Sequence, residues 1–337
     1  MRVFSPRPKP KRSGREVNMQ KEPLLILTGP TAVGKTSLSI RLAKAVDGEI
    51  ISADSMQVYQ HMDIGSAKIR PEETEGVPHH LIDVLKPWED FNVVIFQRMA
   101  KEAIREIRSR GKIPILTGGT GFYIQAVLYD IDFTRNPEDG ACRRQLEQEA
   151  ARLGVDYLHE KLRQVDPKSA ERIHANNVKR VIRALEFYMQ TGQRISEHND
   201  QESGKAPACD ACYFVLNDDR EAVYERIDRR VDGMLRQGLV EEVERLKEMG
   251  CEKGMVSMQG LGYKEILSFL DGECTLDEAV YRIKRDTRHF AKRQLTWFRR
   301  ERDVIWVDKR EHPTEEACLS YMLEACVEKI GVRRIQQ

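Results

Sequence analysis

The stretch GPTAVGKT, Gly29 to Thr36, has the residue types and spacing of a phosphate-binding loop. It follows a short apolar run and precedes a helical pattern, as a G-x-x-x-x-G-K-[ST] loop requires. The glycines let backbone amides approach an anion, Lys35 supplies a mobile positive charge, and the hydroxyl of Thr36 suits Mg²⁺. The loop predicted to bind a diphosphate consists of Gly29, Pro30, Thr31, Ala32, Val33, Gly34, Lys35 and Thr36.

An acidic residue at the end of a second apolar run is the next candidate for chemistry. Asp54 closes EIISAD and is followed by Ser55, Met56 and Gln57. In a kinase or an ATPase such an acid helps to hold the metal. Beside amide and hydroxyl groups it can instead grip a base edge and accept its proton, and Gln is the natural bidentate partner of adenine. The structural alternative is that Asp54 caps a helix.

A glycine-rich turn, LTGGTGFY, ends a third apolar run at residues 116–123. Gly118, Gly119 and Gly121 would allow a ligand to approach closely, and Thr120 presents a hydroxyl there. An ordinary turn explains the same residues equally well.

Composition bounds the protein class. The chain has 337 residues, 40% of them hydrophobic and 32% charged, and a formal net charge of +1, so any basic surface must be local. No apolar run approaches the roughly 18–20 residues of a membrane helix, and we expect no membrane segment. Seven scattered cysteines without a secretory leader favour free thiols and a cytoplasmic location. Cys209 and Cys212 have the spacing of zinc ligands, but no second pair lies nearby.

Apolar runs and helical patterns alternate in the first third of the chain, which predicts a P-loop NTPase-like α/β fold with a parallel sheet flanked by helices. An almost continuously helical stretch then predicts an all-helical insertion, and residues 193–211 read as an irregular, mobile connector. The expected organisation is a disordered basic arm at 1–20, a core at 21–133 and 211–315, the insertion at 134–210, and a C-terminal helix or tail at 316–337.

Eight segments occur in the order seen in the tRNA dimethylallyltransferases, also called tRNA isopentenyltransferases. These segments are GPTAVGKT, ISADSMQVY, MDIGSAK, PHHLIDV, PILTGGTGFY, NNVKRVIRALE, MQGLGYKE and AKRQLTWFR. The likeness runs from about Leu24 to Asp308, and ordinary P-loop kinases do not share DSMQVY. The sequence therefore resembles this family closely.

The resemblance implies an activity. Enzymes of this family transfer a dimethylallyl group from dimethylallyl diphosphate to the exocyclic 6-amino group of the tRNA adenosine at position 37, 3′ of the anticodon. By resemblance Asp54 is the general base and Thr120 lies near the reacting centre. Lys35 and Mg²⁺, held partly by Thr36, would stabilise the departing diphosphate, and Arg230 would clamp it. Without the resemblance, Arg230 reads equally well as a surface arginine.

The resemblance also implies tRNA contacts, made by the helical insertion and by segments of the core. The residues implied are Asp54, Ser55, Met56, Gln57, Arg143, Lys179, Arg180, Val181, Ile182, Arg183, Gln259, Gly260, Leu261, Gly262, Tyr263 and Lys264. The basic stretch at 278–301 interleaves arginines with Phe290, Trp297 and Phe298, which suits RNA but also suits a helix that buries its aromatic side chains. We expect a monomer.

Other readings of the loop remain. A P-loop kinase for a small metabolite explains Gly29 to Thr36 but neither DSMQVY nor the basic helix. An adenylate isopentenyltransferase of the cytokinin type shares the loop and the aspartate but has less need of the insertion. A GTPase-like RNA-binding switch would require an N-K-x-D segment, and none is found.

Overall fold

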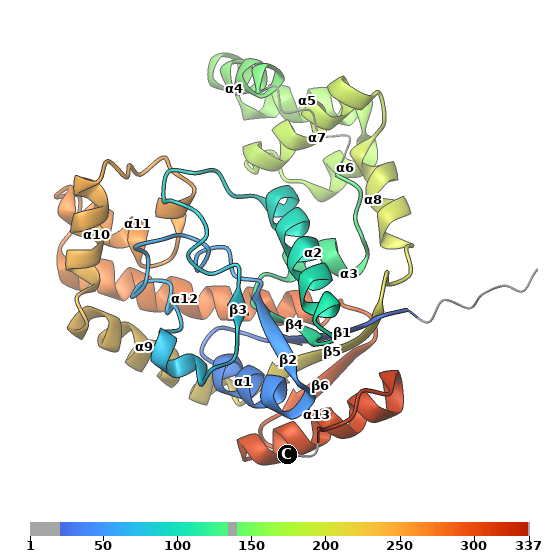
Figure 1. Cartoon of the computed structure of the whole chain (residues 1–337). Helices are drawn as coiled ribbons and strands as arrows, with labels where there is room; N and C mark the ends of the chain where they lie inside the picture. Colours follow the sequence, from blue (N-terminus) through green and yellow to red (C-terminus); the bar gives the residue numbers. More distant parts are fainter. Residues whose placement is uncertain (1–20, 134–139, 336–337) are drawn as a thin grey trace, which may run out of the picture.

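A parallel sheet forms the centre of the computed structural model, which describes residues 21–133 and 140–335 (Figure 1). The order of the six strands is β3-β2-β4-β1-β5-β6, and every pairing between them is parallel. The strands are β1 (Pro23–Thr28), β2 (Gly48–Ser52), β3 (His79–His80), β4 (Ile113–Gly118), β5 (Asp210–Asn217) and β6 (Val304–Asp308). The predicted α/β fold is confirmed, whereas the predicted arm at 1–20 lies outside the described residues.

Strand β1 is buried on both faces, which explains why it reads as a continuous apolar run. Leu24 and Ile26 belong to one apolar core, and Leu25 and Leu27 belong to the other. The helices α1 (Lys35–Val46) and α13 (Glu315–Ile330) supply the second of these cores. The helices of the first core include α2 (Val93–Ser109), α3 (Gly121–Leu128), α9 (Arg220–Arg236), α10 (Leu239–Glu248), α11 (Tyr263–Leu270) and α12 (Leu276–Phe298).

Helix α12 is the long element that ties these parts together. Its N-terminus is capped by the hydroxyl of Thr275, which accepts a hydrogen bond from the Glu278 N–H at 3.2 Å. It packs against α9, α11 and α3 along a stripe with helical spacing. The short 3₁₀ segments η1 (Pro71–Thr74) and η2 (Ser257–Gln259) complete the described core.

A second lobe stands above the sheet in Figure 1 and has a small apolar core of its own. Its helices are α4 (Ala141–Leu153), α5 (Val155–Val165), α6 (Pro167–Arg172), α7 (Val178–Thr191) and α8 (Ile195–Ser203). The expectation of an irregular connector at 193–211 was wrong, because that stretch contains α8 and the start of β5.

The carboxylate of Asp166 explains why α8 is ordered. The side chain is 1% exposed and accepts hydrogen bonds from the N–H and hydroxyl of Ser169 at 3.1 and 2.7 Å. It also accepts bonds from the N–H and hydroxyl of Ser196 at 3.0 and 2.7 Å. Burial alone would raise the pKa of Asp166, but these hydrogen bonds outweigh it and the pKa is lowered. The carboxylate thus ties the start of α8 to α6.

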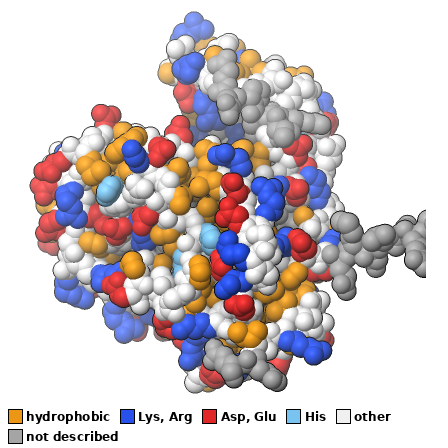
Figure 2. Space-filling model, in the orientation of Figure 1, with side chains coloured by type: hydrophobic (Ala, Val, Ile, Leu, Met, Phe, Trp, Pro, Cys, Tyr) orange, Lys and Arg blue, Asp and Glu red, His pale blue; other side chains and the backbone are white. Residues whose placement is uncertain are grey.

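The surface carries both signs of charge. In Figure 2 acidic and basic side chains are interspersed over the visible face, in agreement with a net charge of +1. None of the described helices has the length and apolar character needed to cross a bilayer. Cys212 is buried in β5 beside α13, and the described residues offer no group of three or more His, Cys, Asp or Glu that could hold a metal.

Replacement of Asp166 by alanine should loosen the lobe, because four donors would lose their buried acceptor. We expect amides 195–203 to exchange with deuterium at least about tenfold faster, which corresponds to about 1.4 kcal/mol of local stability. Asp156→Ala, at an exposed position of α5, is the matched control. Equal exchange in the two variants would contradict this role of Asp166.

Candidate functional site

The loop Gly29 to Thr36 joins β1 to α1 at the edge where the parallel strands end. Gly34 has a φ of 96°, and a Cβ on Gly29 would lie 2.3 Å from the carbonyl oxygen of Leu216, so the loop requires glycine at both places. Because α1 begins at Lys35, its free amides face the loop. The Lys35 ammonium folds back and donates to the carbonyls of Gly29 at 3.1 Å and Pro30 at 2.8 Å.

Asp54 and Thr120 lie side by side next to this loop. The Ala53 N–H donates to the Thr117 carbonyl at 2.7 Å, and the Thr120 N–H donates to the Ala53 carbonyl at 3.4 Å. The end of β2 is therefore held against the turn that follows β4.

The charges of Arg230 and Asp54 act on the pKa of Lys35, and the charge of Asp54 acts on the pKa of Arg230. Burial lowers the pKa of Lys35 to about 7, the nearby Arg230 lowers it as well, and Asp54 opposes both. Burial also lowers the pKa of the Arg230 guanidinium, and the charge of Asp54 opposes this shift. Much of the Arg230 side chain nevertheless remains accessible to solvent. The loop, the end of β2 and helix α9 thus bring two cations and one carboxylate to a single place.

One oxygen of Asp54 is committed to the backbone and the other is available. Oδ1 accepts the Met56 N–H at 2.8 Å, which forms a tight turn rather than the helix cap considered as an alternative. Among the described residues, Oδ2 has no hydrogen-bond partner. A half-buried carboxylate with one free oxygen can accept a proton from a bound ligand.

The glycines of the turn after β4 make room for protein, which corrects the expectation that they make room for a ligand. A Cβ on Gly118 would lie 2.3 Å from the Ala53 carbonyl oxygen, and one on Gly121 would lie 2.2 Å from the Trp297 ring. A Cβ on Gly119 would lie 2.2 Å from Nε2 of Gln294. The three glycines let β2 and α12 approach the turn.

Gln294 is a site residue that the sequence reasoning missed. Its side chain, 6% exposed, accepts the Thr31 N–H at 2.9 Å and donates to the Gly119 carbonyl at 2.9 Å. It therefore joins the phosphate loop to the turn that carries Thr120. The available signal was a polar residue on the buried stripe between Ala291 and Phe298.

Arg226 braces the loop from the other side. Its Nε donates to the Ala32 carbonyl at 2.9 Å, and its guanidinium pairs with Asp218 at 2.6 Å. Arg226 lies one helical turn before Arg230, so one face of α9 supplies both the brace and the free cation.

Comparisons with known proteins place the chain in a family. A family profile described as IPP transferase matches residues 57–301, and one described as Isopentenyl transferase matches residues 23–86. The chain belongs to the IPP transferase family. A tRNA dimethylallyltransferase of Lachnoclostridium phytofermentans is 61% identical over 308 residues, which cover 91% of this chain and 98% of that protein. Another, of Carboxydothermus hydrogenoformans, is 51% identical over 306 residues, with the same two coverages of 91% and 98%.

Solved structures of IPP transferases share the fold. A tRNA isopentenylpyrophosphate transferase from Staphylococcus epidermidis is 42% identical, has a TM-score of 0.68, and the match covers 91% of this chain and all (100%) of that one. A eukaryotic dimethylallyltransferase described as acting on tRNA is 30% identical, with a TM-score of 0.79 and coverage of 94% of this chain and 81% of the other.

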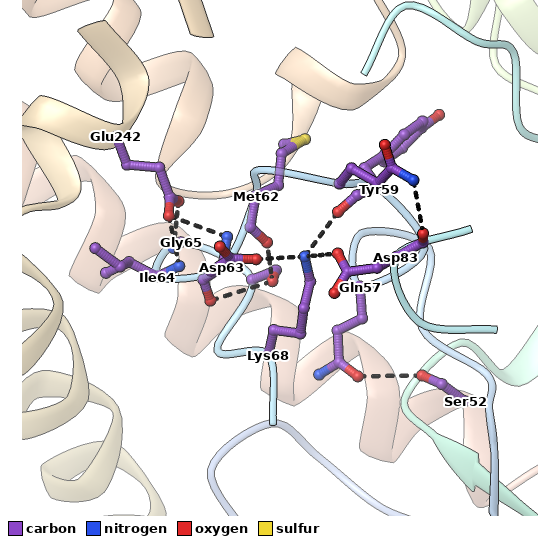
Figure 3. Close-up of polar contacts among 12 residues, drawn as sticks. Ser52, Gln57, Tyr59, Met62, Asp63, Ile64, Gly65, Lys68, Asp83 and Glu242 are labelled. Atoms are coloured by element: carbon purple, nitrogen blue, oxygen red, sulfur yellow. Dashed lines mark hydrogen bonds and ion pairs between the residues drawn. The ribbon is translucent and has the colours of Figure 1, made fainter. Parts of the chain in front are cut away.

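Gln57 follows the carboxylate in the family segment DSMQVY, but its amide is already engaged. Its Oε1 accepts the Ser52 hydroxyl at 3.1 Å (Figure 3). Its Nε2 donates to the Ala67 carbonyl at 3.4 Å. These bonds orient the amide within the protein. Neither end of the Gln57 amide is therefore free for the bidentate pairing with adenine that the sequence led us to expect.

The family segments MDIGSAK and PHHLIDV meet at the ammonium of Lys68, whose side chain is 4% exposed. It donates to the Tyr59 carbonyl at 2.7 Å, to Asp63 at 2.6 Å and to Asp83 at 2.5 Å (Figure 3). The three acceptors lie on two stretches of chain with little regular structure. Lys68 thus fixes the chain that follows Asp54.

Glu242 of α10 holds the same stretch from the core. Its carboxylate accepts the N–H groups of Asp63, Ile64 and Gly65 at 3.0, 2.8 and 3.0 Å. It also accepts the hydroxyl of Tyr263 at 2.8 Å. Four donors on one buried carboxylate make a strong anchor.

Only part of each expected tRNA segment faces solvent. Lys179, Arg180 and Arg183 are exposed on α7, whereas Val181 and Ile182 are 1% and 3% exposed and belong to the core of the lobe. The direct contact expected of the two apolar residues is therefore corrected to a packing role.

The segment Gln259 to Lys264 shows the same division. Gln259 is exposed, and Leu261 and Lys264 are half-buried. Tyr263 is 0% exposed and bonded to Glu242, Gly262 is also buried, and a Cβ on Gly260 would lie 2.6 Å from the Met56 side chain. The buried residues of this segment support the end of β2 rather than forming a surface.

Arg143 is not brought to Asp54. Its guanidinium pairs with Glu186 of α7 at 2.8 Å, and α4 lies at the outer end of the lobe in Figure 1. Its charge does act on Arg183, whose pKa is lowered by burial and by Arg143. Arg143 therefore belongs with the basic residues of the lobe.

A hollow of about 760 Å³ separates this lobe from the core. Its arginines come from both sides: Arg172, Arg180, Arg183, Arg300 and Arg302. Phe122, Phe187 and Trp297 also line it. Burial raises the pKa of Glu301, at its floor, to about 7. Guanidinium and aromatic groups around one hollow suit phosphates and unstacked bases.

Some residues of the basic helix α12 pack inside the protein or form ion pairs, and others face solvent. Phe298 is buried in the core, whereas Trp297 packs against Phe122 and also lines the hollow. Arg288 is paired with Asp228 at 2.6 Å. Lys292 and Arg293 of α12, together with Arg300 just beyond its end, are exposed and line a second, open hollow of about 400 Å³.

Lys68→Met should destabilise the protein by about 1–3 kcal/mol, because two aspartates and a carbonyl lose their cation while their partial exposure limits the loss. We expect a lower midpoint of thermal unfolding and slower turnover. Lys253→Met, which removes an exposed ion pair with Glu273, is the matched control and should change stability by less than about 0.5 kcal/mol. Equal stability of the two variants would exclude the anchoring role.

Binding of a diphosphate should take up a proton above pH 7. With a pKa of about 7 the Lys35 amine is largely neutral there, and a bound anion favours the ammonium. Affinity for dimethylallyl diphosphate should therefore weaken as the pH rises from about 7.5 to 8.5, where this diphosphate monoester is itself almost fully ionised. Calorimetry in buffers of different ionisation enthalpy measures the uptake. Lys35→Arg remains charged over this range and should abolish it; uptake that persists in this variant would assign the proton elsewhere.

Proposed function

We propose that this chain transfers the dimethylallyl group of dimethylallyl diphosphate to the exocyclic 6-amino group of adenosine 37 in tRNA, next to the anticodon. The observation that carries the proposal is the free oxygen of Asp54 beside the phosphate loop and the cations Lys35 and Arg230. The curated relatives that match 91% of the chain are named for this activity on tRNA.

In the proposed reaction, the bond between the allylic carbon and the diphosphate oxygen breaks, and its electron pair leaves with the diphosphate. The amino nitrogen of adenine forms the new C–N bond and loses a proton to the free oxygen of Asp54. Lys35, Arg230 and the loop amides stabilise the negative charge that develops on the leaving group. Thr120 follows β4 and is held next to the end of β2, because its N–H donates to the Ala53 carbonyl at 3.4 Å.

Mg²⁺ fits this site through Thr36. The residue is exposed at the start of α1, and its hydroxyl has no partner among the described residues. Mg²⁺ takes most of its ligands from phosphate oxygens and water, so one protein hydroxyl suffices. When bound, the ion would neutralise charge on the diphosphate.

The tRNA would lie across the arginine-lined hollow between lobe and core. Arg180 and Arg183 from one side and Arg300 from the other offer charges to the loop phosphates. The target base must leave its stack to reach Asp54, which costs little in a single-stranded loop. We propose that the protein acts as a monomer in the cytoplasm, where tRNA is found.

Two alternatives are less favoured. An adenylate isopentenyltransferase would need no arginine-lined hollow, and the matching relatives are named for tRNA. A small-metabolite kinase accounts for the loop but not for the carboxylate held at its side.

Asp54→Asn tests the proposal. Loss of the proton acceptor should slow transfer by about 10²–10⁴-fold, while binding of inorganic diphosphate changes little because the loop is intact. Mass spectrometry of tRNA nucleosides after incubation with dimethylallyl diphosphate and Mg²⁺ measures the product. Asp47→Asn, at the end of α1, is the control and should retain wild-type turnover. Near-normal transfer by Asp54→Asn would refute the base assignment, and modification of AMP but not tRNA would favour the alternative acceptor.

A further inference from the structure

Lys309, which follows β6, reaches the phosphate loop. Its Nζ lies 2.8 Å from the point where a Cβ on Gly34 would stand, and its Cε lies 3.9 Å from that point. The ammonium therefore fills the space that the glycine leaves open. Lys309 lies beyond residues 57–301, which the IPP transferase profile matches.

The strand order places Lys309 on the opposite side of the loop from Asp54 and Thr120. Asp54 follows β2 and Thr120 follows β4, and both strands lie on one side of β1. Lys309 follows β6, which lies on the other side of β1 beyond β5. A diphosphate in the loop must turn its prenyl end toward Asp54 in order to react, so its terminal phosphate lies toward Lys309.

The neighbouring cations are committed to carboxylates, whereas the Lys309 ammonium is free. Arg310 is paired with Asp308 at 2.5 Å, and Asn217 donates to the same carboxylate at 3.1 Å. Among the described residues, Nζ of Lys309 has neither a hydrogen bond nor an ion pair. A half-buried ammonium without a partner beside an anion-binding loop is prepared for an anion.

The backbone fixes the position of Lys309. Its N–H donates to the Asn217 carbonyl at 3.0 Å, which continues the β5–β6 ladder by one residue. The backbone of Lys309 is thus held by the sheet, and only its flexible stem needs to be ordered by the ligand. A cation placed in this way loses less entropy on binding than one on a mobile loop.

We propose that Lys309 binds the terminal phosphate of the prenyl diphosphate. The inference rests on the proposed function for the direction of the diphosphate. Lys35 and Arg230 lie near the end of the diphosphate that carries the prenyl group, because the charge of Asp54 affects the pKa of both. Lys309 lies at the opposite end. A group attached to the terminal phosphate, such as a nucleoside, would have to displace this side chain, so Lys309 also favours a diphosphate with a free end.

Lys309→Met is the test, with inorganic diphosphate and Mg²⁺ as the probe in calorimetry. We expect binding to weaken by about tenfold or more, the effect of losing one charge-assisted contact. The KM for dimethylallyl diphosphate should rise, while the KM for tRNA should stay within about twofold, which also shows that the variant is folded. Lys309→Arg should restore most of the affinity, because it keeps a cation of similar reach.

Lys329→Met removes an exposed lysine of α13 that forms a single hydrogen bond among the described residues, to the Asp303 carbonyl at 3.0 Å, and controls for the change in net charge. If Lys309→Met binds inorganic diphosphate within about twofold of Lys329→Met, the inference is overturned even though wild-type transfer to tRNA continues. If the wild-type protein transfers no prenyl group to tRNA, the proposed function fails first, and the direction assigned to the diphosphate fails with it.

Discussion

The proposed function requires the structure to hold the concentrated negative charge of a diphosphate. Such a group binds only where amides and cations are already held in place. Because the positive groups repel one another, the fold must supply the energy that holds them together. The loop Gly29 to Thr36 meets this demand at the edge of the sheet. Gln294 and Arg226 brace it from α12 and α9, and the close approach of Leu216 to Gly29 fixes its start. The lowered pKa of Lys35 reflects the cost of burying its ammonium and, second, of placing it near Arg230.

The acceptor side is built differently, because the chain after Asp54 has little regular structure with which to hold a carboxylate. Instead of a helix or a sheet, the buried ion pairs and hydrogen bonds of Lys68 and Glu242 hold this stretch in place. The phosphate side and the acceptor side therefore keep their relative positions through polar contacts between distant segments. A hollow lined with arginines lies between this core and the helical lobe. A chain with a net charge of +1 therefore still offers a strongly basic local surface.

Several residues take their meaning only from their surroundings. Gly118, Gly119 and Gly121 read in sequence as openings for a ligand, yet the space above them is filled by Ala53, Gln294 and Trp297. Val181, Ile182 and Tyr263 lie in family-like segments but point into cores. A motif records which residues occur together, whereas burial depends on packing partners that are distant in the chain.

The sequence by itself determined the parallel α/β fold, the glycine-rich loop between β1 and α1, the place of Asp54 just after β2 and the succession of helices in the lobe. Each of these rests on local spacing: apolar runs, the glycines of the loop, and helical periodicity. The tertiary structure alone decided the brace of Gln294, the ordered helix α8, the engaged amide of Gln57 and the reach of Lys309 to Gly34. These contacts join segments that local patterns treat separately, because strand order and helix packing, rather than sequence spacing, bring them within bonding distance.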